Sequence, residues 1–163
     1  MAIVYLGLGS NLNDPIVQLK RAKVALEQWD DSRVVQSSPL YQSQPLGGVA
    51  GPPYINAVVK IQTVLAPLAL LHQLHTIESD QGRVRGSDRW SSRPLDIDIL
   101  LYDNIILDSP MLTIPHYGMR TRAFVLQPLA DIAPDLQLPT GELLKSLLQS
   151  ANVNELVLVE EVL

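Results

Sequence analysis

The apolar and polar positions of the chain follow two different periods. Continuous runs of β-branched and other apolar residues predict strands, whereas apolar residues at three- and four-residue intervals predict helices. In order along the chain, the predicted elements are a strand at 2–9, a helix from Pro15, strands at 33–42 and 54–63, a helix from Pro67 to near Gly82, and a strand at 95–102. The order β-α-β-β-α-β is typical of a ferredoxin-like α+β fold, an antiparallel sheet with two helices on one face.

Both predicted helices have one apolar face. That face consists of Ile16, Leu19, Ala22, Leu26 and Trp29 in the first helix, which Asn13 or Asp14 can cap, and of Leu68, Leu71, Leu74 and Ile77 in the second. Shorter elements follow and predict a C-terminal α/β extension of the core. They are a strand at 105–107, helical pieces within 121–132, a helix at 141–149 capped by Thr140, and an edge strand at 157–159.

Length and composition restrict the class of protein. The chain has 163 residues, of which 47% are hydrophobic and 18% charged, so we expect one domain spanning residues 1–163 with a full core. The absence of cysteine excludes disulfides, thiol nucleophiles and thiolate metal sites. No signal peptide or membrane-spanning run is evident, so we expect a cytoplasmic protein. The net charge of −5 argues against a general nucleic-acid binder.

Positive charge is concentrated in one part of this acidic chain. Six of the eight arginines lie between residues 83 and 122, and the window 83–93 alone carries a net charge of +3 from four arginines and Asp88. Asp96 and Asp98 follow this window. Arginines grip phosphate oxygens and carboxylates hold divalent cations, so the pattern favours a nucleoside triphosphate with its metal. The alternative is a solvated loop with internal salt bridges.

The two aspartates lie within the strand predicted at 95–102. Side chains of a strand alternate between its faces, which places Leu95, Ile97, Ile99 and Leu101 on one face and the two aspartates on the other, roughly 7 Å apart at Cα. Leu100 and Tyr102 continue the aspartate face, so that face is not simply solvated. A divalent cation would remove the repulsion between the carboxylates, and we favour metal ligation over a solvent-facing edge.

Three other features carry weaker signals. The sequence GLGSN (7–11) resembles a phosphate-binding glycine loop but lacks the third glycine or the lysine of such motifs, so a tight strand-to-helix turn is favoured. His116 is the best histidine candidate for a nucleotide contact. Tyr54 and Trp90 could stack on a heterocycle that the Asn56 amide recognises, or could simply fill the core.

Four stretches together carry a family resemblance. GLGSNL (7–12), SPLYQSQPLGG (38–48) with PYINAVV (53–59), GRVRGSDRWSSRPLDIDILLYD (82–103) and LTIPHYGMRTRAFVLQPLADIAPDL (112–136) resemble 6-hydroxymethyl-7,8-dihydropterin pyrophosphokinases of folate biosynthesis. The resemblance is collinear and extends to about residue 150. Its most specific part has the form R-W-x-x-R-x-L-D-x-D, between Arg89 and Asp98.

The resemblance implies transfer of pyrophosphate from ATP to the hydroxymethyl oxygen of the pterin, with release of AMP. Asp96 and Asp98 match the ligands of two Mg²⁺ ions, and Arg83 and Arg93 match catalytic arginines that grip phosphate. The positions that match the ATP site are Glu78, Arg85, Trp90, Ile99, Thr113, His116, Tyr117 and Arg122. Those that match the pterin pocket are Ser43, Pro45, Leu46, Tyr54, Asn56 and Phe124. ATP and the pterin are the expected partners of a chain that is expected to be monomeric.

Some positions depart from the family's pattern, and other functions stay open. Gly86, His75 and Met111 replace a basic residue, a glutamine and an arginine that can occur there, and we expect them to tune ATP affinity and loop dynamics. A non-catalytic nucleotide sensor on the same fold is one alternative, although a sensor does not need an aspartate pair. An RNA-binding module is another, but the charge and the lack of an aromatic RNP-like strand oppose it.

Overall fold

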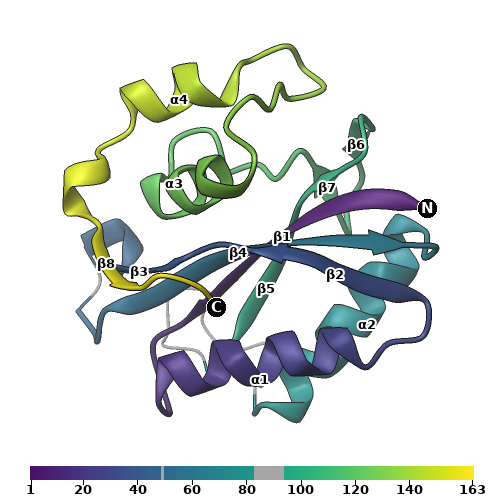
Figure 1. Cartoon of the computed structure of the whole chain (residues 1–163), viewed down its shortest axis with the longest axis horizontal. Helices are drawn as coiled ribbons and strands as arrows, with labels where there is room; N and C mark the ends of the chain where they lie inside the picture. The colour runs from purple at the N-terminus through teal and green to yellow at the C-terminus, as the bar shows by residue number, and fades with distance from the viewer. Residues whose placement is uncertain (49, 83–93) are drawn as a thin grey trace.

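The computed structural model describes residues 1–48, 50–82 and 94–163. Its main sheet has six strands, and a second sheet has two (Figure 1). The main sheet consists of β1 (Ala2–Ser10), β2 (Ser32–Ser37), β3 (Leu40–Ser43), β4 (Tyr54–Thr63), β5 (Asp96–Tyr102) and β8 (Val157–Glu160). The helices are α1 (Pro15–Glu27), α2 (Pro67–Asp80), α3 (Ala123–Ile132) and α4 (Leu144–Ser150), with short 3₁₀ turns η1 (Leu46–Gly48) and η2 (Val153–Glu155).

The sheet has the predicted topology. β1 lies between β4 and β5, both β2 and β3 pair with the far edge of β4, and β8 pairs with β3. Every pairing is antiparallel. The ferredoxin-like α+β prediction is therefore confirmed. The strand expected at 33–42 is two strands, because Pro39 has no N–H to donate and the Ser38 hydroxyl instead accepts the Val58 N–H at 2.8 Å.

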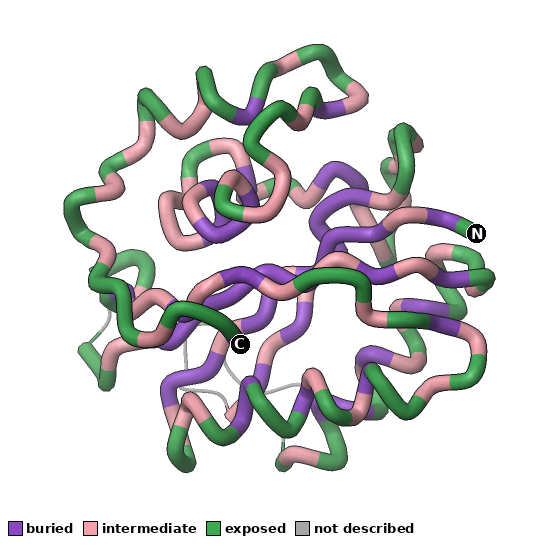
Figure 2. The backbone as a smooth tube through the Cα atoms, in the orientation of Figure 1, coloured by how far each residue is buried: buried purple, intermediate pink, exposed green. Residues whose placement is uncertain are grey.

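The two faces of the sheet have separate cores. α1 and α2 cover one face, and α3 and α4 cover part of the other (Figure 1). On the α1–α2 face, Leu6, Leu8 and Ile61 of the strands pack with Leu19 and Leu74 of the helices. On the other face, a second cluster gathers residues of β1, β4 and β5 with those of α3 and α4. Buried residues are accordingly frequent along the central strands (Figure 2).

Two details of the predicted faces were wrong. In α2 the buried face consists of Leu70, Leu74 and Ile77, while Leu68 is 52% exposed, so the helix is rotated relative to the prediction. In β5 a register shift pairs Tyr5 with Leu101 but Leu6 with Ile99, which leaves Leu100 as an inserted residue. The insertion reverses the alternation beyond it.

The reversal in β5 changes the place of two side chains. Leu101 joins Leu100 in the second cluster rather than continuing the face of Ile99. Tyr102 packs against the first cluster and donates its hydroxyl to the Leu65 carbonyl at 2.6 Å. Leu100 itself stays on the aspartate face, as predicted.

The C-terminal extension is present with shifted boundaries. The expected strand at 105–107 is β6 (Leu107–Asp108), which pairs with β7 (Thr113–Ile114). The helix expected at 141–149 begins at Leu144, and the Thr140 hydroxyl contacts Glu142 and Arg120 instead of capping it. The edge strand expected at 157–159 is β8. Within the described residues, no helix has the length and apolar character needed to cross a membrane.

Candidate active site

Two cavities meet at one end of β5. The first, of about 310 Å³, lies between the strand face of β1, β4 and β5, the segment that follows β3, and the start of α3. The second, of about 300 Å³, lies between α2, β5 and the β6–β7 hairpin. Asp96, Asp98, His116 and Tyr117 line both cavities. These four side chains form a shared wall, which we call the seam.

Two glycines of β1 form part of the floor of the first cavity. Gly9 pairs with Asp96 and Gly7 with Asp98 across the sheet. A Cβ atom at Gly9 would lie 3.3 Å from Asn56 Oδ1, and one at Gly7 would lie 3.3 Å from Leu100 Cδ2. Both glycines lie inside a strand, so the predicted strand-to-helix turn was the wrong explanation for them. Their missing side chains leave room for the cavity.

The two polar residues that follow these glycines contact the residues just before β4 and β5. Ser10 and Asn11 are buried. The Ser10 hydroxyl donates to the Pro94 carbonyl, and the Asn11 amide donates to the Pro52 carbonyl at 3.2 Å. The end of β1 is therefore hydrogen-bonded to Pro52, just before β4, and to Pro94, just before β5.

All six residues predicted for the pterin pocket line the first cavity. They are Ser43, Pro45, Leu46, Tyr54, Asn56 and Phe124. The Asn56 amide is only 4% exposed and donates to the Ser43 hydroxyl at 2.7 Å, which fixes the orientation of the amide. The cavity thus combines an oriented amide with two aromatic rings.

Residues predicted for the ATP site line the second cavity. Glu78, Ile99 and Thr113 are found there together with the seam residues His116 and Tyr117. The departing positions His75 and Met111 also line this cavity, and the Met111 side chain is 71% exposed at its edge. Arg122 lines the first cavity rather than the second.

The Glu78 carboxylate supports the strand that carries the aspartates. Glu78 is 1% exposed, and its Oε2 accepts the backbone N–H of Ile97 at 2.9 Å. Ile97 lies between Asp96 and Asp98 in sequence. An acceptor on the outer edge of β5 therefore fixes the backbone from which both aspartates project.

His116 is held in one tautomer. Its Nδ1 accepts the Gly118 N–H at 3.1 Å, which leaves the hydrogen of the neutral ring on Nε2. Nε2 lies 3.6 Å from Asp98 Oδ2. Burial, and then the positive charge of Arg122, lower the pKa of His116 to about 4, against the opposing effect of Asp96. At neutral pH the ring is therefore an uncharged donor at the seam.

Arg122 lies over aromatic rings beside the seam. Its guanidinium carbon is 5.5 Å from the centroid of the Tyr117 ring and 6.0 Å from that of Phe124, and Tyr117 stacks on His116 at 4.6 Å between centroids. A Cβ at Gly118 would lie 2.4 Å from the guanidinium carbon. Gly118 therefore provides the space that the Arg122 side chain occupies.

The structure brings together the described residues that the sequence predicted for the site. Arg83, Arg85, Trp90 and Arg93, and the departing Gly86, lie outside the described residues. Sequence reasoning missed eight residues of the first cavity, which are Gly7, Leu8, Gly9, Gln44, Ala57, Val58, Leu100 and Val125. The period-two spacing of Gly7 and Gly9 within a strand was the available signal for two of them.

A family model described as 7,8-dihydro-6-hydroxymethylpterin-pyrophosphokinase matches residues 5–134. The chain belongs to this family. Two relatives named 2-amino-4-hydroxy-6-hydroxymethyldihydropteridine pyrophosphokinase agree with the match. The relative from Haemophilus influenzae is 49% identical over 149 residues, covering 91% of this chain and 92% of the relative. That from Pseudomonas aeruginosa is 52% identical over 145 residues, covering 89% of each.

The pyrophosphokinase fold is also found among solved structures. That of an HPPK-DHPS protein in complex with substrates matches with a TM-score of 0.71 at 17% identity. The match covers 91% of this chain and 43% of the other, so the chain spans less than half of that larger protein. The family resemblance and the fold class predicted from the sequence are both confirmed.

Proposed function

We propose that the first cavity binds the pterin, that the second binds ATP, and that pyrophosphoryl transfer takes place at the seam between them. The reaction is that of the family: pyrophosphate moves from ATP to the hydroxymethyl group of 6-hydroxymethyl-7,8-dihydropterin, and AMP is released. The chain is thus an ATP-dependent diphosphotransferase of folate synthesis. The single observation that carries the assignment of the cavities is their shared wall.

The first cavity suits a flat heterocycle with donors and acceptors on its edge. The Asn56 amide, oriented by its bond to Ser43, offers a donor and an acceptor. Tyr54 and Phe124 offer aromatic surface against which a pterin ring can stack. A pterin bound in this way would extend its hydroxymethyl group toward Asp96 and Asp98.

The seam suits divalent metal. Asp96 and Asp98 present hard oxygen donors to both cavities, which is the ligand type that Mg²⁺ prefers. Members of this family generally need Mg²⁺. No cluster of three or more metal-ligating side chains occurs within the described residues, so phosphate oxygens and water would complete the coordination. Bound Mg²⁺ would offset the charge of the phosphates and orient them; we propose two ions.

The remaining contribution of the chain is positioning. Phosphoryl-type transfer requires reacting atoms in line and neutralised charge, and no covalent nucleophile is needed. The neutral His116 ring offers its Nε2–H at the seam, and Arg122 offers a guanidinium beside it. The phosphate-gripping roles of Arg83 and Arg93 stay predictions, as do the single domain, the monomeric state and the cytoplasmic location.

The test is to incubate the protein with ATP, Mg²⁺ and the pterin and to identify the nucleotide product. Pterin-dependent AMP supports the proposal, whereas ADP would indicate an ordinary kinase reaction. ATP binding without a product would favour the nucleotide sensor. The Asn56→Ala variant, which should raise the KM for the pterin more than that for ATP, tests the assignment of the first cavity.

A further inference from the structure

The segment 115–122 borders both cavities but belongs to no strand or helix. It connects β7 to α3 and carries His116, Tyr117 and Arg122. Because regular hydrogen bonding does not fix this segment, its place over the seam depends on individual anchors. Two of the anchors face the sheet. The His116 N–H donates to the Leu100 carbonyl at 3.0 Å, and the Met119 side chain is fully buried in the second core.

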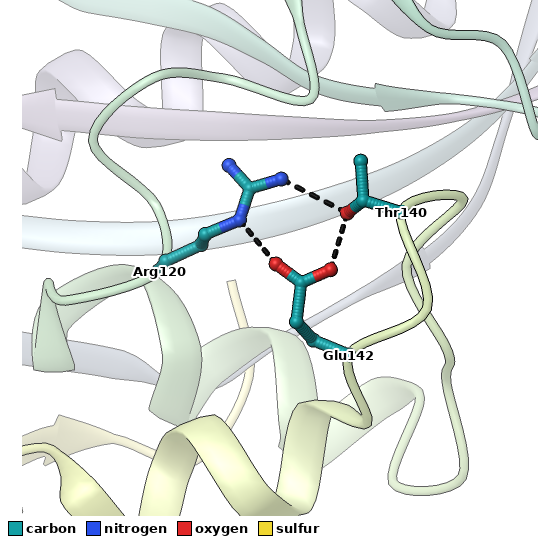
Figure 3. Close-up of polar contacts among 3 residues, drawn as sticks. All are labelled: Arg120, Thr140 and Glu142. Carbon is teal, nitrogen blue, oxygen red and sulfur yellow. Dashed lines mark hydrogen bonds and ion pairs between the residues drawn. The ribbon is translucent and has the colours of Figure 1, made fainter.

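A third anchor faces the turn that precedes α4. Arg120 Nε donates to Glu142 Oε2 at 2.5 Å, and Arg120 Nη2 donates to the Thr140 hydroxyl at 2.9 Å. The Thr140 hydroxyl in turn donates to the other Glu142 oxygen, which closes a ring of contacts (Figure 3). We call these three residues the Arg120 cluster. A planar guanidinium held at two points has little rotational freedom.

The acceptor side of the Arg120 cluster is itself firmly held. The Leu138 N–H donates to the Glu142 carbonyl at 2.8 Å, and the Gly141 N–H donates to the Leu138 carbonyl at 2.9 Å. Leu138 and Leu144, on either side of this turn, are buried in the second core. The turn therefore offers a fixed acceptor rather than a mobile one.

Among the described residues, none beyond Val125 lines either cavity. The part of the chain from residue 134 onward can thus act on the reaction only through the elements that it contacts. We infer that Arg120, Glu142 and Thr140 are positioning residues, which hold the segment 115–122 so that His116 and Tyr117 complete the seam with Asp96 and Asp98 and Arg122 lies beside it. This inference rests on the proposed function, since the segment matters to catalysis only if the seam is the site of transfer.

Loss of the Arg120 cluster should affect both substrates, because one segment serves both cavities. We expect Arg120→Ala and Glu142→Ala each to lower kcat/KM for ATP and for the pterin by about tenfold in fully folded protein, since misplaced groups transfer poorly. The double variant should lose no more than either single variant, because the same contact is removed. Thr140→Val should lose less activity, and Thr140→Ser should keep that of the wild type.

A matched control exists outside both cavities. Lys20 and Glu160 form an exposed ion pair at 3.1 Å, and neither residue lines a cavity. Lys20→Ala, Glu160→Ala and the corresponding double variant should leave kcat/KM unchanged for both ATP and the pterin. If the Arg120 variants lose only thermal stability and keep their kinetic constants at a temperature where they are folded, the cluster is merely structural and the inference fails.

A readout without turnover separates this inference from the proposed function. The chain has only three histidines, so the ring resonances of His116 can be assigned by NMR with a His116→Gln variant. Arg120→Ala and Thr140→Val should shift the His116 resonances and leave those of His72 and His75 in place. Unmoved His116 resonances would overturn the inference. If the wild-type protein forms no AMP, the proposed function fails while this measurement still decides the role of the cluster.

Discussion

On the face that α1 and α2 cover, β1 contributes Leu6 and Leu8 to a continuous apolar core. On the opposite face the same strand contributes Gly7 and Gly9 to a cavity. Side chains alternate between the faces of a strand, so neighbouring residues of β1 have different roles. Leu6 and Leu8 stabilise the fold, and Gly7 and Gly9 leave room for the cavity. The difference teaches that the α1–α2 face is packed without interruption, whereas the other face is packed only where α3 and α4 cover it and is left open at the proposed substrate sites.

The largest expected effect concerns the seam. Asp98→Ala should lower AMP formation by about three orders of magnitude, since metal-assisted charge stabilisation contributes several kcal/mol to such transfers. Folding should be retained, because the substitution removes one of two neighbouring like charges. Steady-state AMP release and circular dichroism test both points. Asp108→Ala, at an exposed position outside both cavities, is the control, and equal losses in the two variants would contradict the role of the seam.

On the α1–α2 face we expect the opposite result, a loss of stability without a loss of activity. Leu26 is 1% exposed in the first core, and Leu26→Ala should reduce the free energy of unfolding by about 2–5 kcal/mol. The kinetic constants of the folded protein should stay near those of the wild type. Urea unfolding measures the loss, and Val24→Ala, which truncates an exposed side chain of the same helix, should change the free energy by less than about 0.5 kcal/mol.

A smaller effect, on ATP binding, is expected at Gly118, where the Arg122 guanidinium occupies the space a side chain would need. Gly118→Ala places a methyl group where the guanidinium lies, so the Arg122 side chain must move while the backbone keeps its conformation. We expect ATP to bind about tenfold more weakly, because Arg122 lines the first cavity beside the seam and would donate from there to an ATP phosphate, and a hydrogen bond to a charged group contributes about 1.5–3 kcal/mol. Calorimetry measures the Kd.

Gly141→Ala is the matched comparison for Gly118→Ala. Gly141 has φ 106° and open space around its Cα, so an alanine there strains the backbone without displacing a side chain. This variant should lose stability and keep more of its ATP affinity than Gly118→Ala does. An unchanged Kd in Gly118→Ala would show that Arg122 does not contribute to ATP binding.

The smallest effect is the pH dependence of the Arg120 cluster. Hydrogen bonds from Thr140 and then from Arg120 lower the pKa of Glu142 to about 2. A carboxyl group with a lowered pKa in the folded protein stabilises it above its ordinary pKa, and this contribution is lost as the pH falls toward 2. The stability difference between wild type and Glu142→Gln should thus be about 0.2–1 kcal/mol at pH 6 and shrink below pH 4.5. Urea midpoints from pH 6 to 2.5 test this, and a constant difference would contradict it.

The core elements could be predicted because their patterns are long. The strand predicted at 54–63 has the observed bounds, and the pattern of α1 placed Leu19, Ala22 and Leu26 in the core as observed. Leu68 was misplaced because leucines on two faces of α2 fit a helical period almost equally well. The insertion at Leu100 was missed because a bulge depends on pairing with β1, which the sequence of β5 alone does not contain.

The candidate site could be predicted where it depends on residue type. Asp96, Asp98, Asn56 and His116 carry chemistry that the motifs indicate, and they lie together as expected. Gly7 was assigned to a turn because a cavity floor is a matter of shape, which appears only when three strands are assembled. The Arg120 cluster was missed for a related reason: it joins two surface segments that are 20 residues apart in the chain.

Two edge strands of the main sheet, β5 and β8, differ in a way that bears on self-association. At the β5 edge, Glu78 occupies the N–H of Ile97. At the other edge, β8 pairs only with β3 within the described part of the chain, and its Val157, Leu158 and Val159 are exposed. Exposed apolar edges promote aggregation, which flanking charges counteract. We therefore expect Glu155, Glu160 and Glu161 to oppose edge-to-edge association, so that neutralising them would favour oligomers without altering either cavity.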